Sequence, residues 1–157
     1  MKKSIVGDEV VSLKIQKSQA RFKRIKNEGP DTGIGFYFLA LEVTALKGAV
    51  LVPLSIASGK KVAGFVYQIE GTGAGTLSKA SVEVRGEGVT QVTLGTLLFA
   101  KIPEGKKAVF RIQIETRGKI GKEYTVLIHQ LNYKQSPTDA RYKKFSGEIR
   151  TRTLEFK

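Results

Sequence analysis

The stretch Lys107-Ala108-Val109-Phe110-Arg111-Ile112-Gln113-Ile114-Glu115 decides the fold class of this chain. Every even-numbered residue in it is apolar, whereas Arg111, Gln113 and Glu115 occupy odd positions. Because successive side chains of a β-strand point to opposite faces, this alternation indicates a strand with one face buried and the other exposed to solvent.

Similar runs recur along most of the chain, and turn residues rich in glycine and proline separate them. The runs begin at Val11, Val50, Phe65, Ala80, Val92, Tyr124 and Leu154. Only Phe36 to Ala45 is apolar on both phases, which is typical of a central strand covered on both faces. About nine strands at spacings of roughly 10–15 residues predict an all-β sandwich or barrel, and we expect two packed sheets. We expect Phe38, Val52, Val84, Phe110, Ile112 and Val126 among its buried residues.

The chain of 157 residues fits a single domain, residues 1–157. We expect residues 1–8 to form a flexible N-terminal tail and the polar segment 134–146 to form a protruding loop. No stretch has the apolar spacing of a long helix, although residues 18–26 could form one short basic helical turn.

The compartment stays open. Cysteine is absent, which excludes disulfides and thiolate metal sites but fits both cytosolic proteins and many bacterial surface domains. No apolar run is long enough for a transmembrane segment, and the basic start Met1-Lys2-Lys3-Ser4 lacks the apolar region of a signal peptide behind it. The protein would lie at the cell surface if a signal peptide was removed, and otherwise in the cytoplasm or a virion.

The charge is strongly basic, with 27 Lys and Arg against 14 Asp and Glu and a net charge of +13. Residues 101–157 carry 14 of the basic residues and 6 of the acidic ones. A basic chain attracts polyanions such as nucleic acid or an anionic wall polymer. The alternative is a solvated surface that self-repulsion keeps soluble.

Two segments interleave cations with aromatic or aliphatic residues, a pattern that can hold phosphates and stack on bases. The first contributes Arg21, Lys23, Arg24 and Lys26. The second contributes Arg141, Lys143, Lys144, Arg150 and Arg152, and we expect Arg150 and Arg152 to share one face of the final strand. These nine residues are the candidate polyanion-binding residues.

Residue patterns that suggest catalysis are weak. Asp31-Thr32-Gly33 matches the aspartic protease triplet but follows a polar loop rather than a buried strand. The glycine-rich run from Gly71 to Thr76 lacks the Lys and Ser or Thr of a phosphate-binding loop. His129 is the only histidine, so a zinc site is not expected. The sequence therefore predicts no enzyme, no cofactor and no metal.

The last third contains Ile102-Pro103-Glu104-Gly105, an alternating strand, Leu131-Asn132-Tyr133 and a final segment with Arg150-Thr151-Arg152-Thr153. In this order of turns and strands, residues 40–157 resemble the immunoglobulin-like β-sandwich modules of bacterial cell-surface and S-layer-type proteins. The resemblance implies an immunoglobulin-like β-sandwich of about 7–9 antiparallel strands with no catalytic residues. Such modules are usually neutral or acidic, so the charge of +13 is a departure.

We therefore expect a non-enzymatic structural or interaction domain at a surface or in a larger assembly. Its partners would be other protein subunits or neighbouring modules, and its basic face would favour anionic ones. The alternative is a sandwich that decorates a capsid or binds nucleic acid without sequence preference. A remote alternative is a homodimeric aspartic protease acting through Asp31. The oligomeric state does not follow from the sequence.

Overall fold

The protein is all-β, as the alternating runs predict. The computed structural model describes residues 5–24, 32–58, 63–71 and 78–157, and these residues form strands and turns but no helix. Thirteen strands are described, more than the expected 7–9, because short pieces such as β1 (Ile5–Gly7), β5 (Ile56–Ser58) and β13 (Leu154–Glu155) escape the periodicity of the sequence.

The strands form three sheets. The front sheet has the order β1-β2-β3-β10-β7, with β2 (Val11–Arg24), β3 (Thr32–Ala45), β10 (Lys107–Lys119) and β7 (Ser78–Arg85). The back sheet has the order β12-β11-β6-β5, with β12 (Lys143–Arg150), β11 (Glu123–Tyr133) and β6 (Phe65–Glu70), and β13 also pairs with β11. The crossing sheet has the order β4-β9-β8, with β4 (Val50–Pro53), β9 (Leu97–Ile102) and β8 (Thr90–Leu94).

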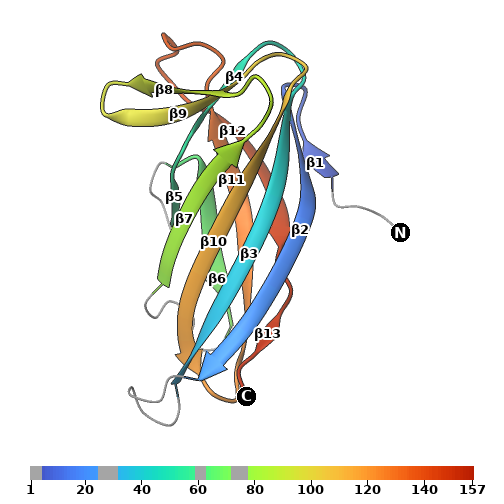
Figure 1. Ribbon diagram of the computed structural model, residues 1–157, viewed down its shortest axis with the longest axis vertical. Coiled ribbons are helices and arrows are strands. Elements are labelled where there is room, and N and C mark those ends of the chain that lie inside the picture. The colour runs from blue at the N-terminus through green and yellow to red at the C-terminus, as the bar shows by residue number, and fades with distance from the viewer. Residues whose placement is uncertain (1–4, 25–31, 59–62, 72–77) are drawn as a thin grey trace.

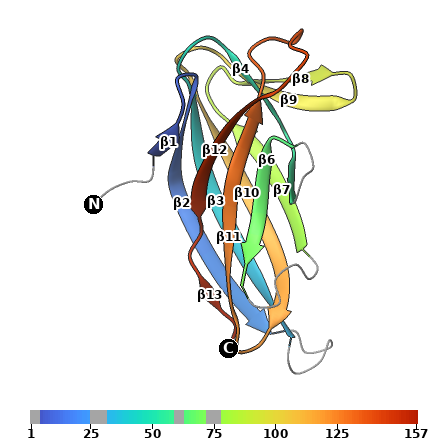
Figure 2. The ribbon, with the colours of Figure 1, turned by 180° about the vertical axis from the view of Figure 1, so that it is seen from behind.

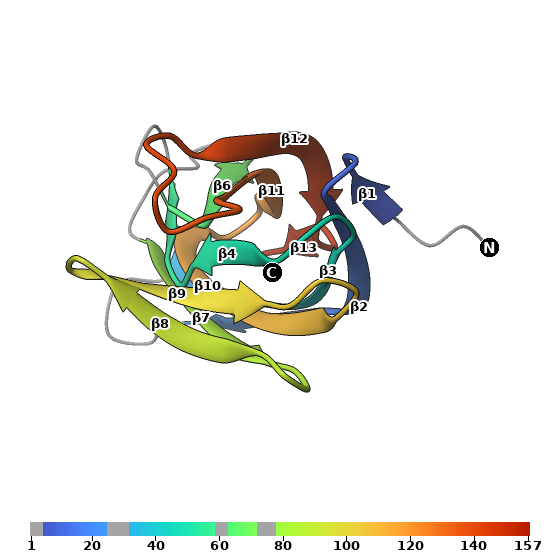
Figure 3. The same cartoon turned by 90° about the horizontal axis from the view of Figure 1, so that it is seen from above.

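The front and back sheets lie one behind the other, as Figures 1 and 2 show from opposite sides. The crossing sheet lies over one end of them (Figure 3). Paired strands are antiparallel, except that β5 runs parallel to β6.

The core lies between the front and back sheets. The ring of Phe110 on β10 packs 5.0 Å from the ring of Phe65 on β6. The Tyr37 hydroxyl of β3 donates a 3.0 Å hydrogen bond to the carbonyl oxygen of Tyr124 on β11. Four of the residues expected in the core are fully buried, namely Val52, Phe110, Ile112 and Val126.

Phe38 and Val84 are only half-buried, contrary to expectation. Val84 lies on β7, the edge strand of the front sheet, so it has strand neighbours on one side only. Phe38 lies on the outer face of β3, over which no other described strand packs. The apolar run from Phe36 to Ala45 is therefore not a strand covered on both faces. On its outer face, Arg21 and Arg111 of the neighbouring strands lie over the rings of Phe36 and Phe38 instead.

Two predicted irregular segments are partly regular. Ile5–Gly7 pairs with β2, and the Asp8 carboxylate accepts hydrogen bonds from the amides of Val10 and Val11 at 2.8 Å. Of the residues 1–8 predicted as a flexible tail, residues 5–8 make these contacts with the start of β2, and residues 1–4 lie outside the described residues.

The loop predicted at 134–146 is shorter, because β12 begins at Lys143. It is also fastened to the crossing sheet. Lys134 and Leu51 exchange backbone hydrogen bonds, and the ring of Tyr142 stacks on Phe99 with centroids 6.4 Å apart. The loop therefore lies against β4 and β9 of the crossing sheet.

Candidate functional site

A β-bulge in β2 decides which side chains reach the outer face of the front sheet. Ile15 pairs with Leu41 of β3, but Lys17 pairs with Ala40, so Gln16 is the extra residue. Because an inserted residue reverses the alternation, odd positions face the core before the bulge and face outward after it. Lys17, Arg21 and Lys23 consequently lie on the outer face. The helical turn considered for residues 18–26 is wrong for residues 18–24, which belong to β2.

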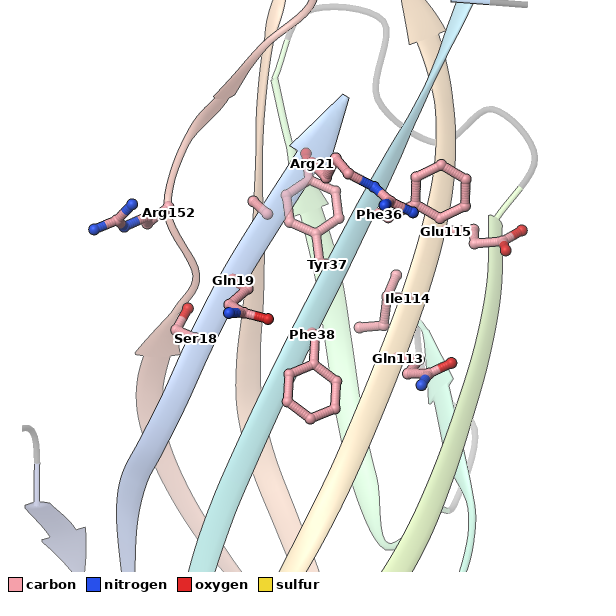
Figure 4. A pocket seen from close by; sticks show the side chains of 11 residues that line it. Ser18, Gln19, Arg21, Phe36, Tyr37, Phe38, Gln113, Ile114, Glu115 and Arg152 are labelled. Atoms are coloured by element: carbon pink, nitrogen blue, oxygen red, sulfur yellow. The ribbon is translucent and has the colours of Figure 1, made fainter. Parts of the chain in front are cut away.

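Phe36 and Phe38 of β3 occupy the middle of this outer face. Directly opposed residues of antiparallel strands share a face, so Phe36 lies between Arg21 of β2 and Glu115 of β10. In the same way, Phe38 lies between Gln19 and Gln113. Figure 4 shows these side chains together.

Each of the two phenyl rings has a guanidinium above it. The Cζ of Arg21 lies 5.3 Å from the centroid of Phe36, and the Cζ of Arg111 lies 5.6 Å from that of Phe38. Both distances fall within the range of cation–π contacts. The rings and their neighbours line a hollow of about 800 Å³, within the size range of ligand pockets.

Cations outnumber acids across the whole outer face. By strand register, its described basic side chains are Lys14, Lys17, Arg21, Lys23, Lys79, Arg85, Lys107, Arg111, Arg117 and Lys119. The described acidic side chains of the same face are Glu42, Glu83 and Glu115. Glu42 is already engaged, since Lys107 lies 3.6 Å from its carboxylate and Gln16 donates a 2.8 Å hydrogen bond to it.

The first predicted cluster is divided by the fold. Arg21 and Lys23 lie on the outer face of the front sheet. Arg24 opposes Gly33, and its Nε donates a 2.8 Å hydrogen bond to the carbonyl oxygen of Lys157. Lys26 lies outside the described residues.

Four of the five residues of the second predicted cluster are spread along the other side of the molecule, whereas Arg152 lines the hollow beside Arg21, Phe36 and Phe38 (Figure 4). Arg141 is exposed in the loop before β12, and Lys143 and Lys144 begin that strand. Arg150 ends it, roughly 20 Å further along by the rise of a strand. The shared final strand expected for Arg150 and Arg152 is wrong, because β12 stops at Arg150 and the last strand is β13.

Arg150 is also paired with acids. It forms an ion pair with Glu70 of β6, and Glu148 of its own strand lies 3.5 Å away. The outer face of the back sheet therefore places acids beside Arg150. The front sheet likewise opposes Glu42 to Lys14, Glu83 to Arg111 and Glu115 to Lys79 in strand register.

Sequence reasoning missed most of the cations on the outer face. They come from three strands, β2, β7 and β10, and none but Arg21 and Lys23 belongs to a dense run. A signal was present in the solvent-facing positions of β7 and β10, where Lys79, Arg85, Arg111 and Arg117 recur at odd numbers.

The groups with shifted pKa values lie at the core and its rim. Burial raises the pKa of the Tyr37 and Tyr133 hydroxyls. Burial also works against ionisation of Asp8, but hydrogen bonds from the Tyr133 hydroxyl and from backbone amides outweigh it and hold the pKa of that carboxyl below its usual value. These shifts belong to structural contacts.

Asp31 and most of the run from Gly71 to Thr76 lie outside the described residues. The structure therefore gives no geometry for the protease alternative. Within the described ranges, no group of three or more His, Cys, Asp and Glu side chains could hold a metal ion. His129 is half-buried on β11.

Three large apolar side chains of the described residues are exposed to solvent. One is Leu46, and the other two lie in the hairpin of β8 and β9. Leu97 is 49% exposed and Leu98 43% exposed. The hairpin extends beyond the two larger sheets (Figures 1 and 3), so these leucines are accessible to a neighbouring molecule.

No helix in the described part of the chain is long and apolar enough to cross a membrane. Comparison of the sequence with protein-family models and with curated proteins gives no match.

Proposed function

We propose that the chain is a non-enzymatic interaction domain, an immunoglobulin-like module of a surface or larger assembly, that binds anionic polymers through the outer face of its front sheet. The observation that carries this proposal is the excess of basic over acidic side chains on that face. Their clustering favours a binding role over a solvated surface, because charges kept for solubility need not collect on one sheet.

Long-range electrostatics supports the same face. Adjacent strands lie about 4.8 Å apart and same-face residues of one strand about 6.6 Å apart, both within the Debye length of about 8 Å at physiological salt. The fields of neighbouring cations therefore add. Lys17, Arg21 and Lys23 occupy three of the four outward positions from Lys17 to Lys23 on β2, with Gln19 at the other, and form a basic strip.

The apolar hairpin supports the part of the proposal that concerns protein neighbours. Exposed apolar side chains that project from a domain commonly mark contacts with other proteins. Leu97 and Leu98 lie in the crossing sheet and not among the cations, so a subunit contact there would leave the front sheet free for an anionic partner.

Two triple variants with the same charge loss test where a polyanion binds. The sheet variant changes Lys17, Arg21 and Lys23 to Gln, and the loop variant changes Arg141, Lys143 and Lys144 to Gln. Binding of heparin and of a duplex DNA of about 20 base pairs would be measured over a range of salt concentrations. Each lost phosphate contact lowers the slope of log affinity against log salt by about 0.9 for duplex DNA.

We expect the sheet variant to flatten the slope by about 2–3 units and the loop variant to change it little. Fold stability should move little in both, because exposed charges contribute little to it. A flattened slope in the loop variant alone would move the binding surface to the second predicted cluster and contradict the proposal. Absence of any salt-dependent binding in the parent would assign the charge to solubility.

A further inference from the structure

We propose that the polyanion bound by the front sheet is a single-stranded nucleic acid, and that two of its bases stack on Phe36 and Phe38. This inference rests on the proposed function and adds the chemical class of the partner. The observation behind it is the pair of aromatic rings at the centre of a cationic face. A surface that bound polyanions by charge alone would not need aromatic residues there.

The two rings are spaced for successive bases. They are two residues apart on one strand and point to the same face, which separates them by about 6.6 Å along β3. An unstacked strand can place neighbouring bases at such a spacing. Sheets that carry exposed aromatic residues bind single-stranded RNA in this way, with two or three bases stacked on the strands.

Arg21 and Arg111 extend this arrangement. Each guanidinium lies over one ring and carries several donors in a planar fork. A base that stacks on a ring displaces or covers the guanidinium, which can then bind a phosphate oxygen or stack on the other side of the base. Gln19 and Gln113 flank Phe38 and can donate to and accept from base edges.

This chemistry favours a single strand over the other anionic polymers. The bases of a duplex stack on one another, so their faces cannot reach a phenyl ring. A phosphate-containing wall polymer has no aromatic ring to stack. Single-stranded nucleic acid is the polyanion that uses both the cations and the two rings.

Binding of a dT oligonucleotide of about 20 nucleotides and of an abasic strand of the same length separates stacking from charge. We expect Phe36→Leu and Phe38→Leu to lower affinity for the dT strand by about tenfold each, and affinity for the abasic strand much less. Leucine keeps the apolar surface and therefore limits damage to the fold. The matched control is Phe145→Leu, which replaces a half-buried phenylalanine on β12 of the back sheet. This variant should bind both strands as the parent does.

A fluorescent reporter gives a second measurement that does not depend on loss of binding. The chain has no tryptophan, so Phe38→Trp places a single one in the hollow. We expect the dT strand to quench its fluorescence and to bind at least as tightly as to the parent, since indole stacks well. The abasic strand should leave the fluorescence nearly unchanged.

The failure of this inference differs from the failure of the proposed function. Equal affinity for dT, abasic strand and heparin, with no effect of either Phe→Leu change, would overturn base stacking and leave a general polyanion-binding face. Tighter binding of duplex DNA or of polyglycerol phosphate than of the dT strand would also overturn it. Failure of the parent to bind any of these polymers at low salt would overturn both.

Discussion

Arg21 and Phe36 oppose each other on β2 and β3, and the guanidinium carbon of Arg21 lies 5.3 Å from the centre of the Phe36 ring. The bulge at Gln16 produces this contact, because without the extra residue Arg21 would face the core side of the sheet. One irregularity near the start of the chain thereby determines both the charge and the aromatic environment of the outer face.

Replacing Arg21 by Gln should weaken binding of the dT oligonucleotide and flatten its salt slope by about 0.7. The change removes one phosphate contact, and it also removes the group that covers Phe36. Unfolding free energy should fall by no more than about 1 kcal/mol, the worth of an exposed cation–π contact. Arg141→Gln removes the same charge from the loop and is the control. Equal effects of the two changes on the slope would mean that only net charge matters.

Removing a negative charge from the outer face should strengthen binding. Glu115 lies beside Phe36 on β10, where its carboxylate repels a bound phosphate. We expect Glu115→Gln to raise affinity for the dT strand about two- to fivefold at low salt, and less as salt screens the interaction. Glu155→Gln changes the net charge equally on β13, which pairs with β11 of the back sheet, and should have little effect. A gain of the same size in both variants would contradict a local role for the outer face.

The strands with unbroken alternation are those that the sequence predicts well. In β10, Phe110 and Ile112 are buried and Gln113 and Glu115 are exposed, as the pattern indicates. In β2 the pattern changes phase at Gln16, and the polar residues beyond it obscure the period. A bulge is set by pairing with the neighbouring strand, so local alternation does not reveal it.

The candidate surface depends on which strands become neighbours. β3, β10 and β7 meet in one sheet although their residues lie far apart in the chain, and local patterns carry no information on that order. The second predicted cluster shows the opposite error: its residues are close in sequence, and on that ground the sequence predicts a shared face for Arg150 and Arg152. The chain leaves β12 at Thr151, which exchanges hydrogen bonds with the backbone of Val126, and this break separates Arg150 from β13.

Adding one methyl group at Gly64 should destabilise the fold strongly. A Cβ atom there would lie 2.0 Å from the carbonyl oxygen of Pro53, which is backbone and cannot move aside. We expect Gly64→Ala to lower the unfolding free energy by about 3 kcal/mol or more, measured by urea unfolding. Gly95→Ala meets no atom within 4 Å but has a φ of +65°, so it should cost only about 1 kcal/mol. Equal losses in the two variants would show that backbone strain rather than crowding decides the cost.

The link between Asp8 and Tyr133 should make stability depend on pH in the acid range. The Tyr133 hydroxyl donates a 2.7 Å hydrogen bond to the Asp8 carboxylate, which also accepts from two backbone amides. These bonds outweigh the opposing effect of burial and hold the pKa of Asp8 below its usual value in the folded protein. The unfolded chain therefore takes up the proton first as the pH falls.

It follows that the stabilisation by the Asp8 carboxylate is complete above a pH of about 4 and is lost as the pH falls through the folded-state pKa. Asp8→Asn should lower the unfolding free energy at neutral pH by about 1 kcal/mol, and the gap to the parent should narrow as the pH falls below about 4. Tyr133→Phe removes one of the three bonds and should reduce the pH-dependent part without abolishing it. Urea unfolding at several pH values between about 7 and 2 measures the gap. A gap that stays constant over this range would mean that the ionised carboxylate contributes nothing beyond what the Asn amide supplies.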